Sequence, residues 1–257
     1  MATRFILIYI VIASVCFTSC TNTKKIAYFR DVQDTAFRAR LPIVEAPLQK
    51  NDILNIKISS LNAKASADFN QAGGADGAAA GGNNQGSGYL IDNNGNIDIP
   101  MLGPIKAEGL TKSQLKQRIT DVILEKKLLL EPVVDIRFMN FEVTILGEVA
   151  KPTVINVPSE KISLVKAIGL AGDLTIYGKR DNVLLIREED GARVTRRLNL
   201  NSSDFLNSPY YYLQPNDVVY VEPNAAKVAV SGRSQQIVPI VFTSISVLLL
   251  VLDKVIK

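Results

Sequence analysis

Three adjacent carboxylates, Glu188, Glu189 and Asp190, give the chain a group of acid–base side chains. Glycoside hydrolysis needs two carboxyl groups held either roughly 5 Å or roughly 6.5–9.5 Å apart, and consecutive side chains beside the turn at Gly191 cannot fix either separation. The chain contains no His, which excludes Ser-His-Asp and Cys-His nucleophiles, His-ligated zinc or haem, and a His proton shuttle. We therefore expect no catalytic residue, no metal site, no cofactor and no enzyme activity.

The thiol of Cys20 is the candidate for a covalent modification. Arg4 precedes an uncharged stretch at residues 5–17, which has the length of a secretory signal core and is too short to span a bilayer. Small residues then lead into Cys20, a pattern similar to a bacterial lipobox, in which the Cys becomes the new N-terminus and carries acyl chains. We expect residues 1–19 to be a signal peptide and Cys20 to be acylated. An ordinary signal peptide or an uncleaved anchor is the alternative.

The residue after Cys20 and the overall charge bear on location and partners. No Asp follows Cys20, so the inner-membrane retention signal of some bacterial lipoproteins is absent, and we expect a lipid-anchored protein of the bacterial outer membrane with its body in the periplasm. The net charge of +4 comes from 29 basic and 25 acidic residues spread along the chain. Nucleic-acid binding needs a dense basic stripe, so we expect no nucleic-acid partner.

The first folded unit is expected at residues 48–140, after a lipidated N-terminus and linker at 20–47. Apolar residues alternate over 54–58, which predicts a strand. The pair Asn94 and Gly95 separates two further strand signals and predicts a hairpin, because both residues tolerate positive φ.

The same unit is expected to contain a helix and a loop. Thr111 and Gln114 form a capping box, and apolar residues at helical spacing follow it. Residues 63–88 are rich in Ala, Gly, Asn and Ser. This composition cannot bury enough apolar surface to offset its ordering entropy, so we expect a flexible loop there.

A second small unit is expected at residues 141–224. Strand signals lie at 141–147 and 218–221, and residues 182–198 predict a hairpin. Ser163 can cap a helix whose apolar positions follow at i, i+3, i+4 and i+7: Leu164, Ala167, Ile168 and Ala171. The predicted fold class is therefore α+β, with two small mixed units in tandem.

An internal echo links the two units. Residues 48–56 and 213–221 share the pattern Leu-Gln-x-Asn-Asp followed by apolar, apolar, any residue and apolar. Each segment enters a predicted strand in the same way. Shared turn chemistry and common ancestry both explain the echo.

The C-terminal residues 225–257 predict a sided membrane helix. Residues 237–252 carry no charge and would form a helix of about 24 Å. Five polar side chains fall within roughly 100° of one another on a helix, whereas Ser244 lies outside this stripe: Gln236, Thr243, Ser246, Asp253 and Lys257. Several copies could turn this stripe inward around water, so we expect an α-helical barrel lined by the first four of these residues. The alternatives are an anchor helix whose hydroxyls bond their own backbone, and a helix docked on the body.

Basic and aromatic residues offer contacts to a ligand. Arg193 and Arg197 share a face of one predicted strand, and Arg187 lies on the preceding strand. Such a patch can attract acidic sugars or an acidic partner, so these arginines are candidates for polysaccharide or partner contact. A solvated strand face is the alternative. Residues 210–212 are three tyrosines, which suit either stacking on sugar rings or edge packing.

Ordered motifs in both units resemble a known family. Residues 95–105 (Gly-Asn-Ile-Asp-Ile-Pro-Met-Leu-Gly-Pro-Ile) and 109–111 are similar to the polysaccharide biosynthesis/export domain. Residues 147–152 (Gly-Glu-Val-Ala-Lys-Pro), 164–172 and 217–221 (Asp-Val-Val-Tyr-Val) resemble the soluble-ligand-binding β-grasp repeat, SLBB. Their order matches the outer-membrane polysaccharide export lipoproteins of capsule and exopolysaccharide systems. Only one SLBB repeat is visible, whereas larger relatives carry two.

The resemblance implies a function without bond chemistry. It implies an export domain at 48–140, an SLBB β-grasp domain at 141–224 and an outer-membrane helix at 225–257. It further implies a homo-oligomeric ring that conducts a capsular polysaccharide or exopolysaccharide and docks onto an inner-membrane polysaccharide co-polymerase. The alternative is a monomeric, membrane-anchored lipoprotein that binds a soluble glycan or small ligand through the β-grasp unit. Membrane lipid is a partner in both cases, through acylated Cys20 and the C-terminal helix.

Overall fold

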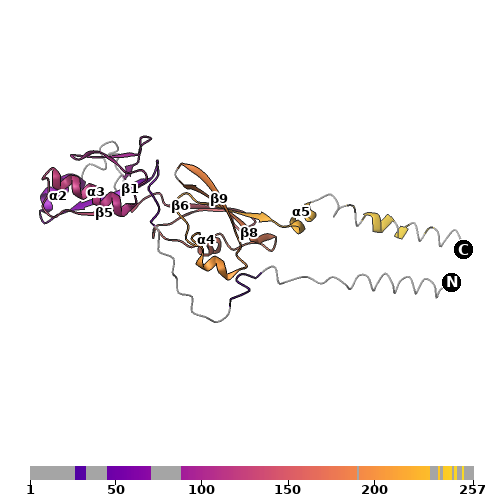
Figure 1. Cartoon of the computed structure of the whole chain (residues 1–257). Helices are drawn as coiled ribbons and strands as arrows, with labels where there is room; N and C mark the ends of the chain where they lie inside the picture. Colours follow the sequence, from indigo (N-terminus) through magenta and orange to yellow (C-terminus); the bar gives the residue numbers. More distant parts are fainter. Residues whose placement is uncertain are drawn as a thin grey trace.

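The computed structural model describes residues 27–32, 45–70, 88–189, 191–231, 237, 240–244, 246–247 and 251. Two mixed units lie end to end, each with its own hydrophobic core (Figure 1). This confirms the expected α+β class with tandem units.

The first unit is built around strand β1 (Ile53–Ser59). It pairs antiparallel with β2 (Tyr89–Leu90) on one side and with β5 (Val133–Phe138) on the other. Side chains of β1 alternate between the core and solvent, as the sequence pattern predicted. The buried face includes Leu54 and Ile58. Helix α2 (Ala63–Asn70) packs against β1, and helix α3 (Lys112–Glu125) packs against β5.

The predicted hairpin at Asn94 and Gly95 is wrong in its pairing. Gly95 adopts φ +78° and its N–H donates to Asp92 O at 2.9 Å, so the turn itself forms. However, β3 (Asn96–Ile99) pairs with β4 (Gly103–Lys106) in a sheet of its own, while β2 pairs with β1. Packing of the core decides which strand pairs with β3, and the residues around the turn carry no information about that packing.

Helix α3 (Lys112–Glu125) confirms the predicted capping box. The Thr111 side chain accepts from Gln114 N, and the Gln114 side chain accepts from Thr111 N at 2.8 Å. Leu115, Ile119 and Ile123 are buried along one face. This face covers the first core, which explains why a helix forms where the cap and the apolar spacing coincide.

The predicted loop at 63–88 is wrong for its first eight residues, which form helix α2 (Ala63–Asn70). Asn62 Oδ1 accepts from Lys64 N and Ala65 N, which caps the helix at its start. At its end, the Asn70 side chain bonds both Ile58 N and Ile58 O, and Phe69 is 2% exposed. One buried aromatic and two specific bonds order this segment, which composition averaging missed. Residues 71–87 lie outside the described part of the chain.

The second unit is a five-stranded mixed sheet in the order β7-β6-β10-β8-β9. The strands are β6 (Glu142–Gly147), β7 (Thr153–Asn156), β8 (Gly178–Glu189), β9 (Ala192–Leu198) and β10 (Val218–Pro223). Strand β10 runs parallel to β6 and antiparallel to β8. The last strand of the unit is therefore inserted between the first strand and the hairpin, which joins the unit into one sheet.

Helix α4 (Leu164–Leu170) covers this sheet as predicted. The Ser163 side chain accepts from Lys166 N at 3.2 Å, and Gly172 follows the helix with φ +81°. All four predicted apolar positions are buried. A short 3-10 helix, η2 (Ser203–Asn207), connects β9 to the tyrosine segment.

The two units are joined at Glu160. Its carboxylate accepts from Lys112 Nζ of α3 and from Phe138 N at the end of β5. The rings of Phe138 and Phe141 meet edge to face with centroids 6.1 Å apart. Gln49 Nε2 of the first unit also donates to Glu188 O at 2.9 Å.

The C-terminal part is described in fragments. Helix α5 (Ala225–Ser231) follows β10, and the described residues between 237 and 251 are helical. Among the residues that the structure describes, no helix is both long and apolar enough to cross a membrane. The predicted transmembrane helix at 225–257 lies partly outside the described residues. The predicted signal peptide at 1–19 and Cys20 lie wholly outside them.

Candidate functional site

Two of the four predicted pore-lining residues are described. Thr243 Oγ1 donates to Ile240 O, and Ser246 Oγ donates to Phe242 O, both at 2.9 Å. This is the arrangement that the anchor-helix alternative predicts. A hydroxyl that donates to its own helix still keeps acceptor lone pairs for water. Gln236 and Asp253 lie outside the described residues.

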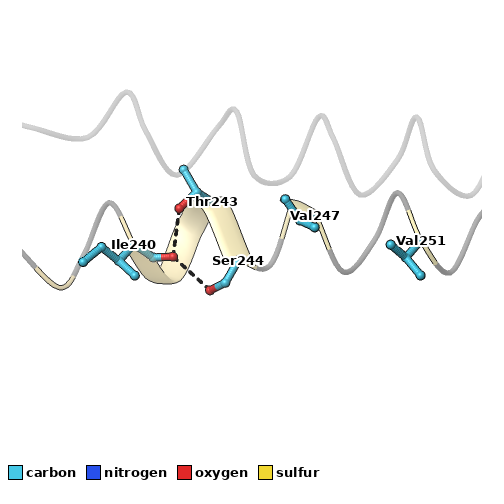
Figure 2. Close-up of a pocket in the computed structure, with 5 residues that line it drawn as sticks. All are labelled: Ile240, Thr243, Ser244, Val247 and Val251. Carbon is cyan, nitrogen blue, oxygen red and sulfur yellow. Dashed lines mark hydrogen bonds between the residues drawn. The ribbon is translucent and has the colours of Figure 1, made fainter.

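A shallow pocket follows one face of this helical segment (Figure 2). Its lining residues recur every three or four positions, with the adjacent pair Thr243 and Ser244 together filling one of them, which places them on one face of a helix: Ile240, Thr243, Ser244, Val247 and Val251. Ser244 Oγ donates to Ile240 O at 2.9 Å, beside Thr243. Ser246 does not line the pocket, so Thr243 lies at the border between this largely apolar face and the predicted polar stripe.

The three arginines predicted for ligand contact are divided between two faces. Strand register pairs Arg187 with Val194, whereas Arg193 pairs with Glu188. Because directly paired residues share a face, Arg187 lies on the opposite side of the sheet from Arg193. Arg187 is 5% exposed, so its side chain lies in the core and not on a surface open to a ligand.

Arg187 pairs with buried Asp217. Its Nε and Nη2 donate to the two carboxylate oxygens at 2.9 and 2.7 Å, and Nη2 also donates to Tyr212 O at 3.3 Å. Burial raises the pKa of Asp217, while the guanidinium of Arg187 and the N–H of Gln214 act against that rise. This bidentate pair ties β8 to the turn that precedes β10.

Arg197 and Arg193 lie on the exposed face. Arg197 Nη1 donates to Glu222 Oε1 at 2.7 Å and to Asn182 Oδ1 at 2.8 Å. Hydrogen bonds from Arg197 and Lys179 lower the pKa of Glu222. Arg197 is therefore partly neutralised, while Arg193 is exposed near the hairpin tip and is the member of the set best placed to meet a soluble anion.

The three tyrosines pack at the edge of the second unit. The guanidinium groups of Arg187 and Arg196 lie 5.5 and 5.8 Å from the centroid of the Tyr210 ring, and the Tyr210 hydroxyl accepts from Arg196 Nε at 2.7 Å. Tyr211 contacts Phe205, and Lys161 lies over the Tyr212 ring at 4.5 Å. All three are half-buried, in keeping with the packing interpretation.

The predicted linker at 20–47 contains a docked segment that sequence reasoning missed. Phe29 N and Arg30 N donate to Leu200 O and Asn201 O, which places the segment beside the second unit. Asp31 accepts from Ser203 N at 2.7 Å, and although desolvation acts in the opposite direction, hydrogen bonds from Ser203 and Ser202 lower the pKa of Asp31. An isolated Tyr-Phe-Arg-Asp run carries no signal of its own, because its partners lie about 170 residues later in the sequence.

Tyr28 completes this docking. Its hydroxyl donates to Asp173, and burial together with that bond raises its pKa. Its ring lies over the guanidinium of Arg180 at 5.2 Å. Arg180 is 5% exposed and bonds backbone carbonyls, so Tyr28 covers a buried cation.

The internal echo folds into two equivalent turns. Asn51 and Asn216 adopt φ 68° and 65°, and each following aspartate accepts a backbone N–H at 2.7 Å. The turns differ in their second carboxylate oxygen. Asp217 Oδ1 accepts a hydrogen bond from Arg187 Nε, whereas Asp52 Oδ1 is buried without a hydrogen-bond partner among the described residues. Burial accordingly raises the pKa of Asp52 to about 6.

Metal chemistry has no candidate in this part of the chain: the described residues contain no group of three or more His, Cys, Asp or Glu side chains that could hold a metal ion.

Comparison with known proteins gives family matches over both folded units. Residues 44–139 match the family described as polysaccharide biosynthesis/export protein, and residues 142–221 match the SLBB domain. Two relatives are named EPS I polysaccharide export outer membrane protein EpsA. The protein from Ralstonia solanacearum is 26% identical over 150 residues, and that from Ralstonia nicotianae is 28% identical over 152 residues.

Each alignment covers 57% of this chain and 39% of the relative, so the chain matches about two fifths of the relatives' length. The two matched domains coincide with the two units of the structure and follow in the same order. The chain belongs to the polysaccharide biosynthesis/export protein family and carries an SLBB domain after its export domain.

Proposed function

We propose that this chain is an outer-membrane lipoprotein that assembles into a ring and provides a passive path for capsular polysaccharide or exopolysaccharide. The observation that carries the proposal is the export domain match directly followed by the SLBB match. Relatives with this region are named polysaccharide export outer membrane proteins. A hydroxyl-rich polymer cannot be desolvated into lipid at tolerable cost, so export requires a water-filled passage.

The C-terminal segment supplies the passage in this proposal. Copies related by rotation meet through heterologous contacts and close into a ring, with Gln236, Thr243, Ser246 and Asp253 turned toward water. The two folded units form a periplasmic vestibule, and the ring docks onto an inner-membrane polysaccharide co-polymerase. Acylated Cys20 adds a second attachment to the outer membrane.

Substitution at Ser246 tests the passage. Ser246→Trp should narrow a pore and reduce surface polysaccharide, while Ser246→Ala, the matched small variant, should leave export near the wild-type level. Both proteins should reach the outer membrane in equal amounts, as judged by fractionation. Equal export by the two variants would contradict a lumen-facing Ser246.

Arg193 is the proposed contact for an acidic polymer. It is exposed near the tip of the β8–β9 hairpin, and long-range attraction between such a charge and an anion weakens with salt. Arg193→Ala should reduce binding of an acidic polysaccharide at low salt, and Arg193→Lys should retain it. Binding by Arg193→Ala that equals the wild type would remove this contact.

The second candidate function is capture of a soluble glycan or small ligand by a monomeric lipoprotein. The hydroxyls of Thr243 and Ser246 bond their own backbone, and this favours a plain anchor helix. Detergent extraction followed by mass measurement separates the two candidates. A particle of several copies supports export, and a monomer supports capture.

A further inference from the structure

One loop holds both ends of the described body. Residues 171–177 connect α4 to β8, and Asp173 in this loop accepts a hydrogen bond from the hydroxyl of Tyr28, which lies eight residues after Cys20. At the other end of the loop, Asn224 N donates to Tyr177 O at 2.7 Å, and Asn224 Nδ2 donates to Ile176 O at 3.3 Å. Asn224 directly precedes α5, so the loop contacts the start of the C-terminal segment as well as the N-terminal segment.

The backbone of this loop is fixed from inside. Arg180 Nη1 donates to Thr175 O and Gly178 O, and Nη2 donates to Leu174 O, at 3.2–3.3 Å. The Tyr28 ring covers the guanidinium. Because these carbonyls point inward to a buried cation, the loop keeps its shape without any external partner.

Apolar side chains nevertheless point away from the fixed loop. Ile176 is 64% exposed in its middle, and Leu170, just before the loop, is 57% exposed. Val228, one turn into α5 from Asn224, is 62% exposed. We call these three residues the Ile176 surface. Asn224 brings Ile176 and Val228 close together, because it donates to Ile176 O and accepts from Val228 N. Exposed apolar side chains that form a contiguous patch mark protein or membrane interaction sites.

Two lysines, Lys151 and Lys227, lie beside the Ile176 surface, together with the carboxylates of Glu148 and Asp173. Lys151 N donates to Ala171 O at 2.9 Å, which places exposed Lys151 beside the loop. Lys227 of α5 lies over the Tyr177 ring at 5.2 Å and pairs with Glu148 at 3.4 Å. Basic residues next to apolar and tyrosine side chains suit the headgroup layer of a bilayer that contains anionic lipid.

The chain length places both membrane attachments near this surface. Eight residue steps from Cys20 to Tyr28 span at most about 29 Å. From Asn224, the seven residues of α5 rise about 10 Å, and six further residues reach the uncharged run at 237 within about 21 Å more. Cys20 and the uncharged run therefore both lie within roughly 30 Å of the loop.

We propose that the Ile176 surface rests on the periplasmic leaflet of the outer membrane, with Ile176 in the boundary between headgroups and acyl chains. The inference rests on the proposed function, because it requires the lipid anchor and the C-terminal membrane segment. It orients the SLBB domain toward the bilayer. The far end of the export domain, where Ser59 pairs with Val133 at the opposite end of β1 from the domain junction, points away from it.

An environment-sensitive fluorophore tests this contact in the full lipidated chain. Ile176→Cys and Leu61→Cys each receive the probe NBD, and the proteins are reconstituted into vesicles of phosphatidylethanolamine and phosphatidylglycerol. Leu61 is the matched control, because it is 85% exposed and lies at the far end of β1. The label at 176 should shift to shorter wavelength and lose most of its emission to lipids spin-labelled near the headgroup. The label at 61 should behave as in water.

The outcomes distinguish the inference from the function on which it rests. A 176 label that stays water-exposed in a lipidated, ring-forming protein overturns the membrane contact and leaves the export proposal standing. A 176 label shielded equally in detergent, and not quenched by spin-labelled lipid, shows a neighbouring copy on the surface and also overturns it. If the probe reacts with Cys20 of the wild-type chain, that thiol is free and the chain is not acylated. This result would refute the lipid anchor itself.

Discussion

Removal of Arg187 is the most demanding test of the second unit. The Arg187→Met substitution keeps much of the aliphatic stem and deletes the guanidinium that donates to both oxygens of Asp217. The side chains are 6% and 0% exposed, so the carboxylate is left in the core with the N–H of Gln214. Breaking a buried pair from one side costs about 3–5 kcal/mol.

The measurement is thermal unfolding of the full chain in detergent, followed by near-ultraviolet circular dichroism. The chain has no Trp, and Tyr210, Tyr211, Tyr212 and Tyr220 all lie in the second unit, so the tyrosine signal reports mainly on it. A cost of 1 kcal/mol shifts the melting temperature of such a unit by about 4–8 °C. Arg187→Met should therefore lower it by at least ~10 °C.

The matched control is Arg197→Met on the neighbouring strand. The Arg197 side chain is 58% exposed in its pair with Glu222, and exposed pairs contribute about 0–1 kcal/mol. The melting temperature of this variant should stay within a few degrees of wild type. A deficit for Arg187→Met no larger than that of Arg197→Met would refute the reasoning.

The pH dependence provides a second check on the same variant. Burial already raises the pKa of Asp217, and loss of Arg187 raises it further. A carboxyl whose folded-state pKa exceeds its unfolded value contributes most stability when protonated and loses it as pH rises through the folded-state pKa. The deficit of Arg187→Met should therefore shrink as pH falls from neutrality toward the unfolded value of about 3.9, and a constant deficit would contradict an ionised, unpaired Asp217.

Three further predictions concern the rest of the chain. Burial raises the pKa of Asp52 to about 6, so the free energy of unfolding of the first unit should fall by about 2–3 kcal/mol as pH rises from the unfolded-state pKa of about 3.9 through about 6. Urea unfolding of Asp52→Asn should lack this pH-dependent fall, and a variant with the wild-type pH profile would contradict the prediction. Phe69→Ala should destabilise the first unit by about 3 kcal/mol in urea unfolding, whereas a loop residue would cost under about 0.5 kcal/mol. Cys20→Ser should abolish incorporation of radioactive fatty acid, and label retained by this variant would exclude Cys20 as the acylation site.

The local elements of this protein were largely predictable. The capping box at Thr111 and the spacing of Leu164, Ala167 and Ile168 identify helices, because caps and apolar periodicity act within a few residues. Helix α2 was missed, since its order depends on Asn70 bonding to Ile58 and on Phe69 entering the core. An average over a polar, glycine-rich window does not register such single contacts.

The functional surfaces were less predictable than the elements. The sequence placed Arg187 with Arg193 and Arg197 because all three lie in one hairpin, and strand register then put Arg187 on the opposite face. The shared Asn-Asp turns were visible in the sequence, but the difference between paired Asp217 and unpaired Asp52 was not. Burial and pairing depend on strands that are remote in the chain.

The sequence by itself determined the family, the tandem α+β organisation and the export and SLBB motifs, since these are written in consecutive residues and local periodicity. Only the tertiary structure decided strand order, the core pair of Arg187 and Asp217, and the docking of Tyr28 on Asp173. These features join residues up to 145 positions apart. Such contacts form only because burial of two hydrophobic cores brings remote segments together, and no short stretch of sequence records that outcome.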